Sequence, residues 1–465
     1  MGKNIFMKIE NTTWKKEKII VIFILIIGLF MSVAIPTWQT PDEYTHVRQI
    51  GESVGVNDFA EKIEKNMAIK RIEGKPDKKV NFKQQKKAMV QHPKYQRKEM
   101  LPQKISLSIL KHFPAMIGIY FGIIIGLPAF WVLQLGELSA LLFYCLVCYE
   151  ALKIMPVKKE AMVCFMLLPM GIQQAASVNY DAVVIPLSYF FISYIFYLKY
   201  SKEMVGLKEC VKVIGLIALI AYIKMPYAVL ILVVFMIPLK KIKIKVGTFE
   251  INGDFLKKIR IPAIILGGIV AIAMVYKMKN MWMIQIVYGY CREWERGLYL
   301  LKATGATWGE FLFVSTVGNF GWLDTPILLG VAISVFVAIF VFSLMKEEKN
   351  ANEKMCVWDI LVLIGTAIIG CLLITIALTD HSLKVTLFGT EKVEYTYEIR
   401  EALYQIPYIG GLQGRYYLPI ASLFFLPIPA VVKVTERKKN ILMMTVQIVL
   451  YVYIFGVIVL RYWIR

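Results

Sequence analysis

Long apolar runs recur along the whole chain and constrain its fold more than any other feature. The first covers Ile19–Ile35, and runs of similar character follow at short intervals. A run of about 20 apolar residues can cross a bilayer as a helix, whose backbone groups bond to one another inside the hydrocarbon. The runs do not alternate apolar and polar residues, as barrel strands do. The sequence therefore predicts an all-α polytopic integral membrane protein.

Composition agrees with this class and indicates its partners. Hydrophobic residues make up 58% of the 465, and the net charge is +21. Because the basic residues cluster in the connections between apolar runs, we expect anionic lipid head groups and membrane-surface phosphates as partners, and no nucleic acid. The seven cysteines lie mostly in or beside apolar runs, and the four histidines show no ligand spacing. No metal site or cofactor is expected, although carboxylates can bind a divalent cation.

We expect about eleven membrane-spanning helices plus one interfacial or re-entrant helix within Ile105–Leu127. If Ile105–Leu127 spanned the membrane, the later basic connections would face outward, against the positive-inside rule. Because Ile105–Leu127 is expected not to span, the second span is Pro128–Leu152. The further expected spans are Ala161–Ala176, Ala182–Tyr200, Val211–Ile223, Tyr227–Leu239, Ile261–Tyr276, Ile327–Leu344, Val357–Leu378, Tyr416–Val432 and Leu442–Leu460.

This topology divides the chain into four parts. Residues 1–18 form a cytoplasmic N-terminus and residues 19–37 the first transmembrane helix. Residues 38–112 form an extracytoplasmic loop with amphipathic helices, since long loops cross the membrane regardless of their charge. Residues 113–465 form the transmembrane bundle, with outer loops at 277–323 and 380–414. No internal repeat is evident, which disfavours an inverted-repeat transporter.

The stretch that follows the first span carries ionisable side chains at the expected membrane surface. It reads Thr40-Pro41-Asp42-Glu43-Tyr44-Thr45-His46. Carboxylates and an imidazole at such a boundary are candidates for chemistry on a membrane-bound substrate. A structural interpretation competes, because Thr40 and Glu43 have the spacing of a capping box and Pro41 suits the first position of a helix.

Further polar residues next to spans are expected on the same outer side. Each has an ordinary structural interpretation: helix capping for Asn179, Asp181 and Asp324, and a lysine reaching the interface for Lys224. Asn319 and His381 complete this group.

The glycine-rich segment Gly410–Pro419 is more informative, because it precedes an expected span with Arg415 and Tyr416. Glycines let the backbone approach a ligand, and a helix N-terminus with a guanidinium suits a phosphate. An arginine at head-group level in an aromatic belt is the alternative.

These segments, in order, resemble bacterial multi-pass membrane proteins of domain-of-unknown-function family 2142, over nearly the whole chain. The segments that carry the resemblance are Pro41-Asp42-Glu43 with His46, Asn179-Tyr180-Asp181-Ala182, Lys224-Met225-Pro226-Tyr227, Gly321-Trp322-Leu323-Asp324-Thr325-Pro326 and Gly414-Arg415-Tyr416-Tyr417-Leu418-Pro419. That family in turn resembles the C-superfamily glycosyltransferases, which take sugars from polyprenyl-phosphate carriers. One departure is Gly136-Glu137, where such proteins often carry an arginine.

The resemblance implies an inverting sugar transfer to a cell-envelope acceptor on the outer face of the bacterial plasma membrane. Asp42 would be the base, with Glu43 as second choice or as a capping residue. Arg415 would hold the lipid phosphate with Lys224 or His46. The implied substrate- and phosphate-binding set is His46, Asn179, Asp181, Lys224, Asp324, Arg415 and Tyr416.

Two other functions remain open at this stage. A transporter or flippase of a lipid-linked glycan or anion would use the same charges as a pathway, and charges buried in several spans would favour it. A non-catalytic envelope-assembly protein would leave the carboxylates in bulk water. Convergence of Asp42 and Arg415 on one cavity would favour the enzyme.

Overall fold

The computed structural model describes residues 16–67, 82–90, 95–246, 249–255, 257–258, 276–277, 282–346, 355–388 and 399–464. The chain forms two compact units, and each is treated by itself. Unit 1 comprises residues 1–193, 320–325 and 440–465, and unit 2 comprises residues 194–319 and 326–439.

Five helices in the described residues are long and apolar enough to cross a membrane. They are α2 (Lys16–Ala34), α8 (Ala129–Ile154), α11 (Asp181–Tyr200), α17 (Val357–Phe388) and α20 (Glu436–Val459) with the π-helical turn η6 (Leu460–Ile464). An all-α membrane protein is therefore confirmed, but the expected eleven spans are not. The expected span Ile261–Tyr276 lies outside the described residues except for its last position.

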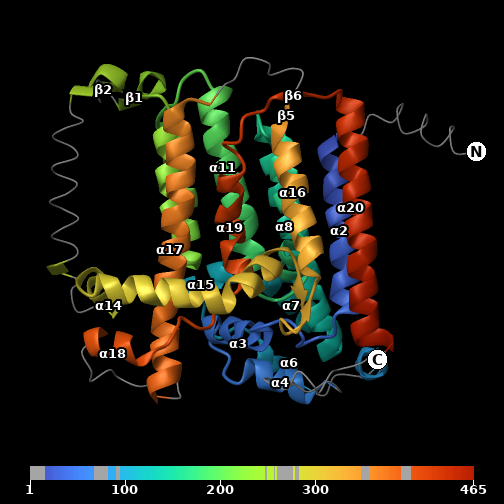
Figure 1. Cartoon of the computed structure of the whole chain (residues 1–465). Helices are drawn as coiled ribbons and strands as arrows, with labels where there is room; N and C mark the ends of the chain where they lie inside the picture. The colour runs from blue at the N-terminus through green and yellow to red at the C-terminus, as the bar shows by residue number, and fades with distance from the viewer. Residues whose placement is uncertain are drawn as a thin grey trace, which may run out of the picture. The chain divides into compact units, whose positions relative to one another are not determined.

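In unit 1, α2 packs against both α8 and α20. Figure 1 shows α2 beside α20, and Phe30 meets Phe455 with ring centroids 4.0 Å apart. A Cβ added at Gly28 would lie 2.4 Å from Leu141 Cδ1. The missing side chain therefore lets α2 approach α8 closely.

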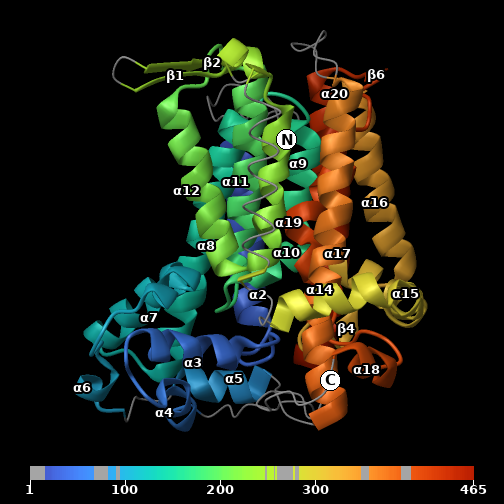
Figure 2. The same cartoon turned by 90° about the vertical axis from the view of Figure 1, so that its left-hand side faces the viewer.

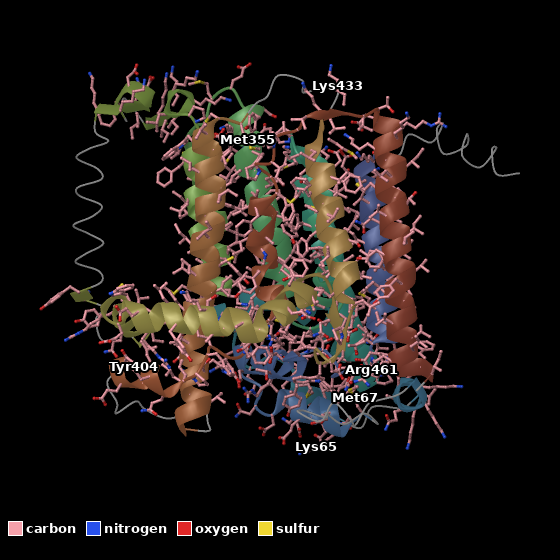
Figure 3. The ribbon with its side chains drawn as sticks, viewed as in Figure 1. Lys65, Met67, Met355, Tyr404, Lys433 and Arg461 are labelled. Atoms are coloured by element: carbon pink, nitrogen blue, oxygen red, sulfur yellow. The ribbon has the colours of Figure 1, made fainter. Side chains whose placement is uncertain are left out.

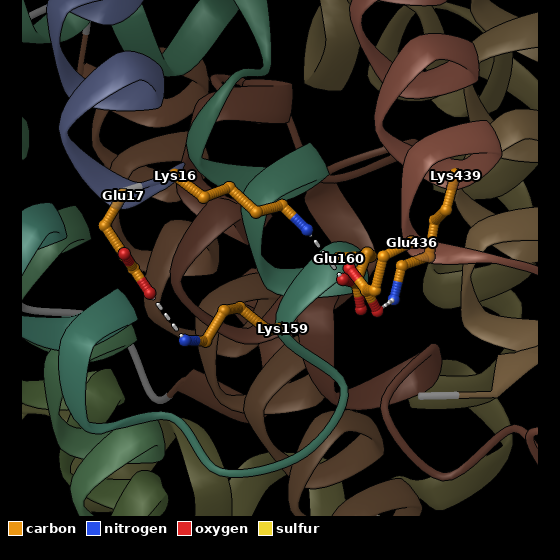
Figure 4. A network of polar contacts seen from close by, with 6 residues as sticks. All are labelled: Lys16, Glu17, Lys159, Glu160, Glu436 and Lys439. Carbon is orange, nitrogen blue, oxygen red and sulfur yellow. Dashed lines mark hydrogen bonds and ion pairs between the residues drawn. The ribbon is translucent and has the colours of Figure 1, made fainter. Parts of the chain in front are cut away.

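Two ion pairs tie the first turn of α2 to α9 (Lys159–Met166). Lys16 Nζ lies 3.0 Å from Glu160 Oε1, and Lys159 Nζ lies 2.8 Å from Glu17 Oε1 (Figure 4). Each helix contributes one acid and one base, so the pairs fix both elements at this end of the unit. The short helix α10 (Pro169–Ala175) follows α9.

The opposite end of unit 1 is built from short helices. They are α3 (Glu43–Ser53), α4 (Phe59–Lys65), α5 (Phe82–Met89), α6 (Arg97–Met100), η1 (Leu107–Lys111) and α7 (Phe113–Ile125), and Figure 2 shows them gathered there. Their core includes Trp38, Phe59 and Phe130. The apolar helix α7 has 13 residues, fewer than the roughly 20 that a bilayer requires. The interfacial or re-entrant placement of this segment stays a prediction.

In unit 2, the last turns of α11 are followed by two apolar helices separated by a break at Lys224. They are α12 (Leu207–Ile223) and the 3₁₀ helix η2 (Met225–Met236), followed by η3 (Leu239–Lys241). Pro226 explains the break, because it cannot donate the backbone hydrogen bond that would continue α12. Helix α17 packs on η2, and Trp358 Nε1 donates to the carbonyl of Phe235. The remaining apolar helix of the unit is α16 (Leu329–Leu344).

Helix α17 is longer than its apolar sequence predicts. The expected span ended at Leu378, with a polar outer segment from Asp380, but the helix continues to Phe388. Asp380 and Lys384 explain part of the extension, since they form a salt bridge of 2.7 Å one turn apart. Figure 3 shows Met355, just before α17, and Tyr404 at opposite ends of unit 2.

Helices α14 (Trp282–Arg292) and α15 (Trp294–Val317) run across α17 rather than along it (Figure 1). Tyr288, Trp294 and Tyr299 are exposed on them. Exposed aromatic rings on a helix lying across a span are typical of the membrane–water interface. The sequence predicts an outer loop at 277–323, and the described residues 282–317 of that segment form these two helices.

Short elements complete the fold. The hairpin β1 (Lys243–Val246) and β2 (Phe249–Asn252) is antiparallel, with Lys243 opposite Asn252. Strands β5 (Met345–Lys346) and β6 (Val432–Lys433) pair in parallel. The others are β3 (Asn319–Phe320), β4 (Thr325–Pro326), α18 (Ile399–Gln405), η4 (Gly414–Tyr417), α19 (Leu418–Ala421) and η5 (Ser422–Phe424).

Candidate functional site

The turn that joins α2 to α3 has an unusual backbone. Trp38 and Asp42 both adopt left-handed conformations, with φ of 68° and 66°. A large aromatic residue rarely adopts such a φ, and strained backbone of this kind is concentrated at functional sites. Asp42 directly precedes α3 without a side-chain capping bond, and its carboxylate is half-buried. The turn thus presents Asp42 beside the end of the first span.

Glu43 takes a different position from the one that a capping box would give it. Its carboxylate accepts hydrogen bonds from the backbone N–H of Trp38 at 2.8 Å and of Val178 at 3.4 Å. The capping-box interpretation is therefore wrong for this residue. Glu43 instead ties the turn after α2 to the segment before α11. Burial raises the pKa of Glu43 to about 7, although both N–H donors oppose this shift.

A small cavity lies against Glu43. Its lining residues are Met31, Ser32, Ile35, Pro36, Thr40, Glu43, Glu137, Gln173 and Ala176. The cavity has about 10 Å³, room for about one water molecule. Glu137 belongs to α8, is 3% exposed, and accepts a hydrogen bond of 2.9 Å from Gln134 Nε2. Two buried carboxylates from distant parts of the sequence thus line one cavity that is too small for a sugar.

His46 of α3 lies in a cluster of three rings. Its Nδ1 is 3.0 Å from His112 Nε2, and its ring meets the edge of Tyr180 with centroids 4.6 Å apart. Burial, the nearby His46 and Lys111 hold the pKa of His112 well below its ordinary value. A hydrogen bond between two imidazole nitrogens needs a proton on one of them and a lone pair on the other. The pair can therefore hold or pass a single proton.

Asn179 and Asp181 lie at the start of α11. The Asn179 Oδ1 accepts from the backbone N–H of Ala182 at 2.9 Å, and its Nδ2 donates to Ser177 Oγ at 2.6 Å. This is the helix-capping arrangement that the sequence offered as its structural interpretation. Asp181 is buried at the first position of the same helix.

Asp324 forms an ion pair with Arg461 of η6, and Arg461 Nε also donates to Thr325 Oγ1 at 3.0 Å. Figure 3 labels Arg461. The neighbouring Trp322 donates through Nε1 to the carbonyl of Trp38 at 2.8 Å. The segment 320–325 is thereby fastened to the turn after α2 and to the C-terminal turn of unit 1.

In unit 2, two cations approach the ring of Tyr416. Lys224 Nζ lies 3.7 Å from the ring centroid, and the Arg415 guanidinium carbon lies 5.3 Å from it. Tyr227 donates through its hydroxyl to the carbonyl of Tyr416 at 2.8 Å. Arg415 is 2% exposed. Lys224, which is distant in the sequence, therefore joins the neighbouring residues Arg415 and Tyr416 in one cationic cluster, which we call the Tyr416 cluster.

Gly414 supports this cluster in a way that the sequence did not predict. A Cβ at Gly414 would lie 2.2 Å from the backbone nitrogen of Thr316, at the end of α15. Its own N–H donates to Ser315 Oγ at 3.0 Å. The glycine thus permits close approach to a neighbouring helix, where the sequence had suggested a ligand. Gly411, with φ of 74°, packs in a similar way against His381.

The predicted site residues divide between the two units. Asp42, Glu43, His46, Asn179, Asp181 and Asp324 belong to unit 1, whereas Lys224, Arg415 and Tyr416 belong to unit 2. The convergence of Asp42 and Arg415 stays a prediction. Sequence reasoning assigned no role to Glu137, His112, Gln173 or Arg461. Glu137 could have been found, because a carboxylate inside an apolar helix is a default candidate for function.

These features define a helical membrane protein with ionisable side chains buried at one end of its first span. The chain belongs to the family described as predicted membrane protein (DUF2142), whose profile matches residues 25–424. Searches of curated proteins and of solved structures give no match. The family description names no reaction, so the activity must be inferred from the residues themselves.

Proposed function

We propose that this protein transfers a sugar from a polyprenyl-phosphate carrier to a cell-envelope acceptor at the outer face of the plasma membrane. The observation that carries the proposal is the position of Asp42. It is a half-buried carboxylate in a left-handed backbone conformation directly after the first span. Glu43 is less suited to meet an acceptor, because it is 3% exposed and engaged with two backbone N–H groups.

The chemistry assigns Asp42 as the general base. The acceptor hydroxyl oxygen attacks the anomeric carbon while the bond from that carbon to the carrier phosphate oxygen breaks, which inverts the configuration. The hydroxyl proton passes to Asp42, and the polyprenyl phosphate leaves with its electron pair. His46, Asn179, Asp181 and Asp324 bind or orient the substrate in this proposal. Asn179 follows Val178, whose N–H donates to Glu43, and Asp324 lies two residues after Trp322, which donates to the carbonyl of Trp38.

The Tyr416 cluster supplies the complementary chemistry for the leaving phosphate. A guanidinium forms paired hydrogen bonds with phosphate, and an ammonium adds a second positive charge. Both are held against the Tyr416 ring, which limits their freedom. Positive charge that is already in position stabilises the leaving group without reorganisation.

The distribution of charge supports the proposed orientation. The end of unit 1 opposite Asp42 carries Lys16, Lys153 and Lys159 beside the spans. Basic residues flank spans preferentially on the cytoplasmic side. The N-terminus is then cytoplasmic, and Asp42 faces the outside.

Reconstituted protein in lipid vesicles tests the proposal with radiolabelled polyprenyl-phosphate sugars and candidate acceptors. We expect Asp42→Asn to slow transfer by roughly 10²- to 10⁴-fold. Glu52→Gln, an exposed carboxylate near the end of α3, is the matched control and should keep its activity. Transfer that survives both Asp42→Asn and Glu43→Gln would remove the proposed base.

A second candidate function is proton-coupled transport of a lipid-linked glycan or anion. It is favoured by one observation, the burial of Glu137 inside the span α8. Ionisable residues inside spans often mark ion or proton pathways. In vesicles with an imposed pH gradient and no acceptor, carrier movement that stops with Glu137→Gln would support transport over transfer.

A further inference from the structure

The cavity beside Glu43 contains an unusual set of polar side chains. Glu43 and Glu137 are each 3% exposed and line it from α3 and α8. None of the nine described residues that line the cavity is basic. Two ionised carboxylates around a small buried cavity repel each other strongly, so the arrangement calls for a compensating positive charge.

Gln173 of α10 gives independent support for a ligand in this cavity. It is 2% exposed, and neither its amide oxygen nor its amide nitrogen has a hydrogen-bond partner within the described part of the chain. Buried amides nearly always find partners, so one lining a cavity without any points to an occupant. Its oxygen can serve as a neutral ligand, as asparagine and glutamine carbonyls do in cation sites.

The end of α2 adds a favourable field. Met31, Ser32 and Ile35 line the cavity at the point where α2 ends. The C-terminus of a helix carries about half a negative charge. Helix C-termini followed by unwound backbone form cation sites in other membrane proteins. This field disfavours an anion in the cavity and favours a cation.

We infer that Glu43, Glu137 and Gln173 bind one divalent metal cation at the end of the first span. The charge of the two carboxylates matches that of a divalent ion. The described residues contain no cluster of three His, Cys, Asp or Glu side chains suited to a metal. The proposed site instead combines two acids with the neutral oxygen of Gln173, and Thr40 and Ser32 also line it.

The size of the cavity discriminates between cations. At about 10 Å³ it can hold one particle of the size of a water molecule. Mg²⁺ usually keeps several of its waters, whereas Ca²⁺ accepts an all-protein set of carboxylate and carbonyl oxygens. We therefore expect Ca²⁺, or Mn²⁺ as its spectroscopic substitute, to bind more tightly than Mg²⁺.

The site would cross-link three elements, α3, α8 and α10. Glu43 also holds the backbone of Trp38, so a bound cation would fix the turn that carries Asp42. This role is separate from sugar transfer, because cation binding needs neither donor nor acceptor. A protein that binds the cation but transfers no sugar would refute the proposed function and leave this inference intact.

The test uses the full-length protein in detergent or nanodiscs, stripped with EDTA and then titrated with Ca²⁺, Mg²⁺ or Mn²⁺. Thermal unfolding and the electron paramagnetic resonance of Mn²⁺ report binding. We expect saturable binding near one ion per chain, and a rise in unfolding temperature that is larger for Ca²⁺ than for Mg²⁺. Glu137→Gln should weaken binding by at least about tenfold, whereas Glu52→Gln should match the wild type.

Gln173→Met provides a second variant if Glu137→Gln does not fold, because it keeps the volume and removes the hard oxygen. It should also weaken Ca²⁺ binding by about tenfold. The inference is overturned if wild type shows no cation-dependent shift, or if Glu137→Gln and Gln173→Met both bind like wild type. Higher thermal stability of Glu137→Gln in EDTA, without cation binding by wild type, would instead indicate carboxyls that share a proton.

Discussion

His46 Nδ1 lies 3.0 Å from His112 Nε2, although 66 positions separate the two residues in the sequence. The contact joins the first turns of α3 to the start of α7 and is closed by the ring of Tyr180. Because His112 is buried and faces another imidazole, adding a second proton to the pair is unfavourable. The pair therefore makes the stability of unit 1 depend on pH.

The first prediction concerns the loss of stability at acidic pH. The pKa of His112 in the folded protein is well below its ordinary value of 6.5. The unfolded chain then binds more protons than the folded one below pH 6.5, so the stability from neutral His112 is present above that pH and is lost as the pH falls. We expect the unfolding free energy of His112→Gln to fall less steeply than that of the wild type between pH 7 and pH 5. Thermal or denaturant unfolding over this pH range measures the difference.

His381→Gln is the matched control, because His381 belongs to unit 2 and is not a member of this pair. The unfolding free energy of this variant should fall between pH 7 and pH 5 as steeply as that of the wild type. An equally steep fall in wild type and His112→Gln would contradict the claim that His112 makes the stability depend on pH. The comparison must be made as a difference between variants, since Glu43, with its raised pKa, changes wild-type stability in the opposite direction over part of this range.

The second prediction concerns the ion pair of Asp324 with Arg461. Arg461 is 8% exposed, so Asp324→Asn leaves a buried guanidinium without its counter-charge. Breaking such a pair costs about 3 kcal/mol of stability. Asp380→Asn, which removes the pair with Lys384 on one helix, should cost less than about 1 kcal/mol. Denaturant unfolding of the two variants measures the difference, and equal losses would show that the Asp324 pair is not effectively buried.

Local signals in the sequence predicted part of this structure correctly. Continuous apolar runs located α2, α8, α11, α17 and α20, since hydropathy is a property of a single segment. The capping role of Asn179 follows from its position just before a helix. The break between α12 and η2 follows from Pro226.

Contacts between distant segments could not be predicted in the same way. Arg461 lies 137 positions from Asp324, and no periodicity links them. Thr40 and Glu43 have the spacing of a capping box, but tertiary packing turned Glu43 toward Trp38 and Val178. Around Glu137 the sequence shows only a departure from a family pattern. The cavity that Glu137 lines could not be predicted, because it forms only where α8, α10 and the end of α2 meet.

The third prediction concerns Gly414. A Cβ there would collide with backbone atoms of Ser315 and Thr316, at 2.4 and 2.2 Å, and backbone cannot move aside cheaply. We expect Gly414→Ala to destabilise the protein by about 1–3 kcal/mol. Gly365→Ala in α17 is the control, since a Cβ there meets nothing within 4 Å. That change should be neutral or slightly stabilising in thermal unfolding, and a neutral Gly414→Ala would show that α15 and η4 separate easily.

The last prediction tests the Tyr416 cluster through its ring. Tyr416→Phe keeps the aromatic face that Lys224 approaches at 3.7 Å, and the bond from Tyr227 goes to the backbone of residue 416, so both contacts survive. Tyr416→Leu removes the face. A cation–π contact is worth about 0.5–2 kcal/mol, so we expect Tyr416→Leu to weaken binding of a polyprenyl-phosphate donor by about tenfold.

Donor binding by reconstituted protein, measured with a radiolabelled polyprenyl-phosphate sugar, separates the two variants. Tyr416→Phe should bind within about twofold of wild type if the ring acts through its face, because its quadrupole is retained. Lys224→Met should resemble Tyr416→Leu, since the two changes disrupt the same contact and their effects should not add. If Lys224→Met and Tyr416→Leu both bind donor like wild type, the phosphate is held elsewhere. In that case the contact of Lys224 with the ring has only a structural role, which is to hold this lysine between α12 and η2.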